Sequence, residues 1–274
     1  MNPKQAAAEH GASLVRSGMA LGLGSGSTST LMVQAIGRML RDGVLRNVVG
    51  VPSSSGIASV AKESGVPLST LDEHPVLDLN LDGADEVDPE LSLVKGLGGA
   101  LLWEKIVATA SRQVVILVDE TKLVTRLGTK APLPVEVVPF GWKTHLAFVA
   151  SLGGAPLLRT EPDGRPFVTD EGNYILHCRF EGGIADPAEL EARLLKRAGI
   201  VGTGLFLGVA HRVIVGKVGG VEVLTRRPNR LLKKGPSAVT HPADGYPARS
   251  RGAATYSEVR LAPRIARRLA AGPF

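Results

Sequence analysis

The chain has 274 residues, of which 44% are hydrophobic and 21% are charged, and Cys178 is its single cysteine. This composition excludes disorder throughout, and one cysteine excludes both an intrachain disulfide and a zinc site built from cysteines. No stretch approaches the roughly 20 consecutive apolar residues of a membrane-spanning helix, so we expect no membrane partner. The first ten residues lack the pattern of a secretory signal, which predicts a cytoplasmic protein.

The net charge of +6 is concentrated near the C-terminus. After residue 234, six arginines stand against one aspartate and one glutamate, so this stretch carries 6 − 2 = +4 of the total. We expect residues 233–274 to form a basic, solvated and partly disordered extension. A weak contact with a polyanion is the alternative, but we do not expect nucleic acid to be a partner.

The first half of the chain alternates between apolar strand-like runs and helix-length segments, a pattern typical of a mostly parallel sheet covered by helices. In chain order we expect a helix over 4–16, a strand over 19–23, a glycine- and serine-rich loop and a helix over about 28–41. These are followed by a strand over 48–51, a helix over 56–63, a strand over 76–81, a helix over about 100–110 and a strand over 114–118.

The pattern changes after about residue 130. We expect a small α+β insert here, made of a strand over 135–138, a helix near 142–151, two hairpin turns and a helix over 188–198. Strands over 213–215 and 221–224 are expected to return to the first sheet. The predicted fold is α/β: a Rossmann-like sheet with helices on both faces over 1–130 and 200–232, and a ferredoxin-like insert over 131–199 that makes oligomer contacts.

A Gly/Ser/Thr loop over residues 22–30, G-L-G-S-G-S-T-S-T, lies between a predicted strand and a predicted helix. Such a loop exposes backbone N–H groups at a helix N-terminus, where the helix dipole favours an anion. The spacing is not the dinucleotide pattern G-x-G-x-x-G, and no lysine follows Gly26 as a Walker A loop requires. The loop therefore favours a small phosphate ester, although an ordinary capped turn would have a similar sequence.

Two further motifs lie at or after strand ends, where ligands of open α/β sheets bind. The first, D-G-A-D-E over 82–86, contains the candidate site residues Asp82 and Asp85. We interpret Glu86, Asp88 and Glu90 as solvated acids of a turn. In the second, K-G-L-G-G-A over 95–100 is followed by Glu104.

These side-chain types suit an isomerase. Lys95 can neutralise an oxyanion and Glu104 can move a proton, although an acid in the first turn could equally serve to stabilise its own helix. Lys122, after another strand end, is a candidate phosphate ligand. The six histidines are scattered and form no metal-binding pattern, so we expect them to be surface or hydrogen-bonded core residues.

Together with D-E-T-K over 119–122 and T-D-E-G-N over 169–173, these motifs make the chain resemble the ribose-5-phosphate isomerase A family over roughly residues 4–225. The resemblance implies interconversion of D-ribose 5-phosphate and D-ribulose 5-phosphate in the non-oxidative branch of the pentose phosphate pathway. It also implies no cofactor, no metal, and a homodimer or homotetramer. The alternative is a non-catalytic domain that senses sugar phosphates.

By the same resemblance, Glu104 matches the general base, and Asp82, Asp85 and Lys95 match residues that assist ring opening and hold the reacting oxygens. The matching substrate-binding positions are Lys4, Ser25, Gly26, Ser27, Thr28, Gly83, Ala84, Gly96, Leu97, Gly98 and Lys122.

Two residues depart from the family pattern. Leu97 stands where another glycine is usual, and Trp103 stands where a polar residue usually precedes the base, so we expect a stiffer loop or a more apolar pocket mouth. A glutamate with an ordinary pKa of about 4.3 is a poor base. Burial would raise the pKa of Glu104 and Lys95 would lower it, and the sequence leaves that balance open.

Overall fold

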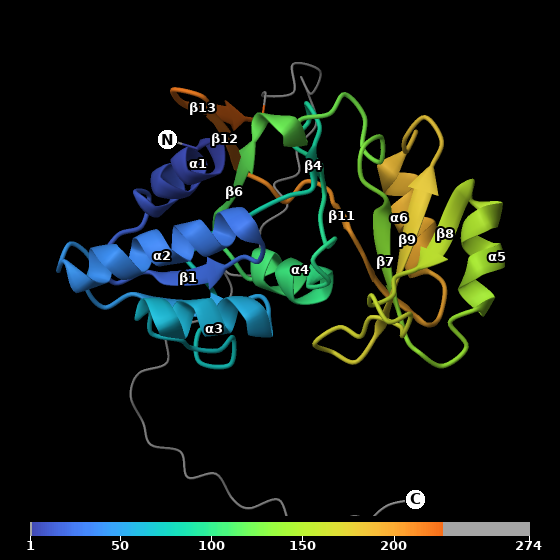
Figure 1. Ribbon diagram of the computed structural model, residues 1–274, viewed down its shortest axis with the longest axis horizontal. Helices are drawn as coiled ribbons and strands as arrows, with labels where there is room; N and C mark the ends of the chain where they lie inside the picture. The colour runs from blue at the N-terminus through green and yellow to red at the C-terminus, as the bar shows by residue number, and fades with distance from the viewer. Residues whose placement is uncertain (1, 227–274) are drawn as a thin grey trace, which may run out of the picture. The chain divides into compact units, whose positions relative to one another are not determined.

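The computed structural model describes residues 2–226. A six-stranded sheet forms its centre, in the order β13-β12-β6-β3-β1-β2, and every neighbouring pair is parallel except β12 and β13. The strands are β1 (Ala20–Leu23), β2 (Val49–Pro52), β3 (Leu79–Asp82), β6 (Val114–Asp119), β12 (Arg212–Lys217) and β13 (Gly220–Thr225). The expected return of the last two strands to the first sheet is confirmed (Figure 1).

Helices cover both faces of this sheet, as expected. Three of them, α1 (Pro3–Ala12), α2 (Ser27–Arg41) and α3 (Ser55–Ser64), share one apolar core with alternate strand residues such as Leu117. On the opposite face, α4 (Leu101–Thr109) packs over the intervening residues. Strands that are buried on both faces have continuous apolar sequences, which is why β6 could be predicted from the sequence.

The helix ends near the cavity are set by local sequence. Asn2 caps α1 by accepting a hydrogen bond from the Lys4 N–H (2.9 Å), and Pro3 occupies the first turn, where its missing N–H costs nothing. Gly26 precedes α2 with φ of 101°, a conformation that favours glycine. The helix expected over 4–16 ends at Ala12, because the residues after it form turns instead.

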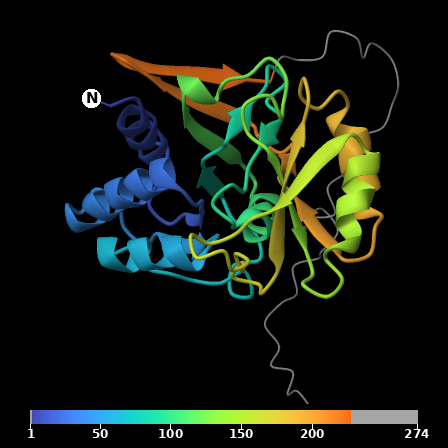
Figure 2. The same cartoon turned by 45° about the vertical axis from the view of Figure 1, so that its right-hand side comes forward.

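A second, antiparallel sheet has the order β10-β7-β9-β8. Its elements follow a βαββαβ sequence: β7 (Leu133–Val137), α5 (Thr144–Ser151), β8 (Gly154–Leu158), β9 (Tyr174–Phe180), α6 (Pro187–Leu195) and β10 (Ile200–Thr203). This order is that of a ferredoxin-like unit, and α5 and α6 pack on one of its faces, as the turned view in Figure 2 shows. Asp186 caps α6 by accepting a hydrogen bond from the Glu189 N–H (3.0 Å).

Three two-residue strands, β4 (Glu86–Val87), β5 (Leu93–Val94) and β11 (Leu205–Phe206), form a third sheet. Elements this short carry no sequence periodicity, and the sequence did not predict β4 or β5. They nevertheless connect the two larger sheets, because β11 follows β10 while β4 and β5 lie between β3 and α4.

Within residues 2–226, no helix is long and apolar enough to cross a membrane. The basic extension expected over 233–274 lies outside the described residues.

Candidate active site

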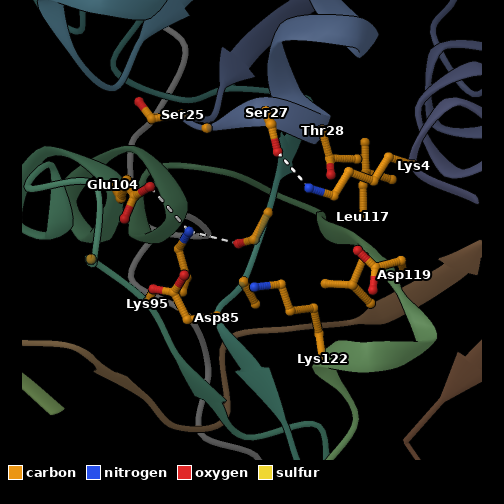
Figure 3. A pocket seen from close by; sticks show the side chains of 16 residues that line it. Lys4, Ser25, Ser27, Thr28, Asp85, Lys95, Glu104, Leu117, Asp119 and Lys122 are labelled. Carbon is orange, nitrogen blue, oxygen red and sulfur yellow. Dashed lines mark hydrogen bonds and ion pairs between the residues drawn. The ribbon is translucent and has the colours of Figure 1, made fainter. Parts of the chain in front are cut away.

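A cavity of about 130 Å³ lies at the carboxyl ends of β1, β3 and β6, where a parallel sheet is expected to bind ligands. Figure 3 shows how side chains from these strand ends and from α1, α2 and α4 surround it. Its lining includes most of the residues expected from the sequence: Lys4, Ser25, Gly26, Ser27, Thr28, Gly83, Ala84, Asp85, Lys95, Gly96, Gly98, Glu104 and Lys122.

The Lys95 ammonium occupies one wall of the cavity. Its Nζ lies 2.9 Å from Asp82 Oδ2 and 3.2 Å from Glu104 Oε1, and it donates a hydrogen bond to the Gly83 carbonyl (2.7 Å). All three ionisable side chains are buried, with 3%, 1% and 6% of the respective side-chain surfaces exposed. Three N–H groups therefore face three oxygens, which fixes the ammonium in one position.

Burial raises the pKa of Glu104 to about 8, although the Lys95 charge opposes this shift and the Asp82 charge adds to it. Burial likewise raises the pKa of Asp82, and Lys95 offsets this only in part. For Lys95, burial favours the neutral amine, but the two carboxylates outweigh it and the pKa of Lys95 is raised. The balance that the sequence left open thus favours a Glu104 pKa far above the ordinary value.

Glu104 Oε2 is buried and has no hydrogen-bond partner within the described part of the chain. An unpartnered carboxylate oxygen costs free energy unless it is protonated or meets a ligand. Because Glu104 lines the cavity, this oxygen is available to a bound molecule.

Asp82 does not line the cavity but acts on it through Lys95 and through the glycine-rich loop. Its Oδ1 accepts hydrogen bonds from the N–H groups of Ser25 (3.1 Å) and Gly83 (2.7 Å). A Cβ on Gly24 would overlap the same carboxylate, so only glycine lets the loop approach this closely. Asp82 therefore couples the position of the loop to that of Lys95.

The opposite side of the cavity carries two more lysines. Lys4, from α1, donates to Ser27 Oγ (3.1 Å), and Lys122 extends from the 3-10 helix Glu120–Lys122 towards the cavity (Figure 3). Together with the N-terminus of α2, these cations give this side of the cavity a positive potential, which favours an anion.

Leu97 and Trp103, the two departures from the expected pattern, do not line the cavity. The Leu97 side chain packs against the core of the second sheet, and its N–H donates to Asp85 Oδ2 (3.0 Å). Leu97 thus contributes a backbone contact that holds Asp85 in place.

Some residues of the site were missed or misjudged from the sequence. Leu117, Val118 and Asp119 line the cavity from the end of β6. For the two apolar residues, only their place at a strand end could have signalled this. Ser25 Oγ is hydrogen-bonded to Ser53 (3.0 Å) and Ser54 (2.7 Å), which also escaped notice.

The interpretation of Glu86 as a solvated acid is wrong. Its side chain is completely buried, because its carboxylate accepts hydrogen bonds from the N–H groups of Gly128, Lys130 and Ala131. Those three donors lie more than 40 residues further along the chain, so local sequence gave no sign of them.

Within residues 2–226, no cluster of three or more His, Cys, Asp or Glu side chains is placed to hold a metal ion. The fold and the cavity define a class of protein: an α/β enzyme with a buried acid–lysine centre and a cationic region in one cavity at strand ends.

Comparisons with known proteins narrow this class. A family model described as ribose 5-phosphate isomerase A (phosphoriboisomerase A) matches residues 49–220. The chain is 53% identical to the ribose-5-phosphate isomerase A of Roseiflexus castenholzii over 80% of its own length and 94% of that protein. It is 50% identical to the protein of the same name from Chloroflexus aurantiacus, with 81% and 92% covered.

Solved structures point to the same family. The ribose 5-phosphate isomerase A of Methanocaldococcus jannaschii superposes with a TM-score of 0.78 at 38% identity, covering 82% of this chain and 98% of that one. A D-ribose-5-phosphate isomerase in complex with phospho-erythronic acid superposes with a TM-score of 0.80 at 37% identity, covering 82% and 100%. The chain belongs to the ribose 5-phosphate isomerase A family, and the comparisons give no support to a sensing domain.

Replacing Lys95 by Met should destabilise the fold by about 3–5 kcal/mol at pH 8, because Asp82 and Glu104 would remain buried without their cation. The loss should be smaller at pH 5, where protonation neutralises the carboxylates whose pKa values are already raised. Urea unfolding at both pH values measures this. Lys217→Met, which removes an exposed ion pair with Glu222, is the control and should change little at either pH. An equal loss for Lys95→Met at pH 5 and pH 8 would contradict the assignment.

Proposed function

We propose that this chain is an aldose–ketose isomerase that interconverts D-ribose 5-phosphate and D-ribulose 5-phosphate. The observation that carries the proposal is the contact of Glu104 with Lys95 on one side of a cavity whose other side is cationic. The acid–lysine pair and the cationic side face each other across the cavity. This arrangement suits a small molecule with a reacting carbonyl at one end and a phosphate at the other. The relatives, which are named as ribose-5-phosphate isomerases, support the same reaction.

In the proposed mechanism, Glu104 removes the proton from C2 of the open-chain aldose. The electron pair of the broken C–H bond forms the C1=C2 double bond of an enediolate, and the carbonyl electrons move to the C1 oxygen. Glu104 then returns the proton to C1 while the proton of the C2 hydroxyl transfers to the C1 oxygen, which yields the ketose. A base with a pKa near the working pH serves both steps well.

Lys95 is proposed to stabilise the negative charge of the enediolate. Its three N–H groups are engaged by Asp82, Glu104 and the Gly83 carbonyl. When Glu104 turns towards the substrate, one N–H becomes free for a substrate oxygen. Asp82 keeps the ammonium in place meanwhile, because its other oxygen is held by two backbone N–H groups. The charge is thus pre-positioned, so little reorganisation is needed when the enediolate forms.

The remaining expected residues are proposed to bind the substrate. Asp85, which lines the cavity, would assist ring opening directly, and Asp82 would assist it through Lys95. Ser25–Thr28, Gly83, Ala84, Lys4 and Lys122 would hold hydroxyl and phosphate oxygens, and the backbone of Gly96–Gly98 would contact the reacting end. For Leu97, the proposed contact is through the main chain, since its side chain packs elsewhere.

We also propose that the protein is cytoplasmic, forms a homodimer or homotetramer, and needs neither cofactor nor metal. The family resemblance supports these points. Light scattering after size exclusion measures the oligomer, and a chelator added to the activity assay should leave the rate unchanged.

Glu104→Gln should lower kcat by at least about 100-fold while leaving the fold intact, because the amide keeps the shape of the side chain but cannot accept the proton. A coupled assay with ribose 5-phosphate measures kcat, and circular dichroism checks folding. Glu63→Gln, on the exposed side of α3, is the matched control. Normal turnover by Glu104→Gln would remove the assigned base, and wild-type protein without turnover would favour the sensing alternative.

Lys122→Ala should raise KM for ribose 5-phosphate by about 10- to 100-fold, because a hydrogen bond to a charged group contributes about 1.5–3 kcal/mol. The value of kcat should change little, since the phosphate is remote from the reacting carbons. Lys62→Ala, an exposed lysine of α3, controls for loss of positive charge. An unchanged KM in Lys122→Ala would show that the phosphate binds elsewhere.

A further inference from the structure

Lys122 belongs to a single-turn 3-10 helix, and such short elements are not rigid by themselves. Its N-terminal side is fixed by Asp119, whose Oδ1 accepts a hydrogen bond from the Thr121 N–H (3.0 Å). Its C-terminal side has no regular helix to support it. Some other contact must therefore fix the direction in which the Lys122 side chain leaves the backbone.

Lys130 provides that contact. Its Nζ donates to the carbonyl of Thr121 (2.7 Å) and to the carbonyl of Leu123 (2.9 Å), the two residues on either side of Lys122. One ammonium group thus binds both peptide carbonyls that flank the cavity lysine. Rotation of the Lys122 backbone would break one or both of these charge-assisted hydrogen bonds.

The buried carboxylate of Glu86 holds Lys130 in turn. Glu86 Oε1 accepts hydrogen bonds from the backbone N–H groups of Lys130 (2.6 Å) and Ala131 (2.7 Å), and Glu86 also accepts from Gly128. The next residue, Val87, accepts a hydrogen bond from the Val124 N–H (2.9 Å). Strand β4 therefore binds the chain at two places after Lys122, first at Val124 and again at residues 128–131.

We infer that Lys130 and Glu86 are positioning residues that aim Lys122 at the substrate phosphate. The inference rests on the proposed phosphate-binding role of Lys122. It extends the acidic motif over 82–86 to the far side of the cavity: Asp82 sets the position of Lys95, and Glu86 sets that of Lys122 through the segment 128–131. Neither positioning residue lines the cavity.

Lys130→Met should raise KM for ribose 5-phosphate by about three- to tenfold and leave kcat within about twofold, because Lys122 loses its direction but not its charge. Lys130 is exposed, so the variant is expected to fold. Lys130→Arg can still donate to both carbonyls and should restore most of the affinity. Arg126→Met removes a charge from the same segment without touching the neighbours of Lys122, and should resemble wild type.

A double-mutant cycle decides whether Lys130 acts through Lys122. In a Lys122→Ala background, Lys130→Met should cause no further rise in KM, since there is no longer a side chain to aim. An independent, additive rise would mean that Lys130 attracts the phosphate by its charge alone and would overturn the inference. So would a wild-type KM in Lys130→Met, or a KM in Lys130→Arg as high as that in Lys130→Met.

Calorimetric titration with phospho-erythronic acid separates this inference from the proposed function. The titration needs no turnover, so affinities can be ranked even in a protein without isomerase activity. Weaker binding by Lys130→Met than by Arg126→Met supports the positioning role whatever the activity. Equal binding by these two variants contradicts the positioning role. Absence of turnover by the wild-type protein would count only against the proposed reaction.

Discussion

The site depends on one buried cation between two buried carboxylates. Lys95 is almost fully removed from water, and so are its partners Asp82 and Glu104. One positive charge cannot fully offset two negative charges in a medium of low dielectric, so at least one carboxylate must resist ionisation. The pKa of both carboxylates is raised, that of Glu104 to about 8, and Glu104 Oε2 lies in the cavity wall with neither a hydrogen bond nor an ion pair in the described part of the chain. The proposed base thus belongs to a centre in which full ionisation is unfavourable.

The fold makes this strained centre rigid. Asp82 ends β3, and its second oxygen is tied to backbone N–H groups, so it cannot turn away from Lys95. The Lys95 N–H donates to the Gly204 carbonyl (2.8 Å), which ties the lysine backbone to the segment that returns from the second sheet. A Cβ on Gly204 would collide with the Lys95 carbonyl, so glycine is required at this crossing. Two segments that are far apart in the sequence, one from each sheet, therefore hold the Lys95 backbone and its ammonium group in place.

Much of this arrangement could be predicted from the sequence, because parallel strands reveal themselves as apolar runs and their carboxyl ends meet at one edge. Those two rules, with the glycine-rich loop, are enough to predict that Asp82, Lys95 and Glu104 lie at one site. The missed features are those formed by long-range contacts. Glu86 looks like any acidic turn residue until the distant segment 128–131 folds against it. Likewise, the pKa of Glu104 depends on burial that only the packed structure defines.

The pH dependence of kcat/KM for ribose 5-phosphate tests the central claim most directly, because it reports the ionisation of the free enzyme. Only ionised Glu104 can accept the substrate proton, so its raised pKa predicts a rate that climbs from pH 6.5, reaches half its maximum near pH 8 and levels off above about pH 9. The substrate phosphate ionises near pH 6, below this step. A kcat/KM that is already level at pH 6.5 would mean that the base has an ordinary carboxylate pKa, and would contradict the account.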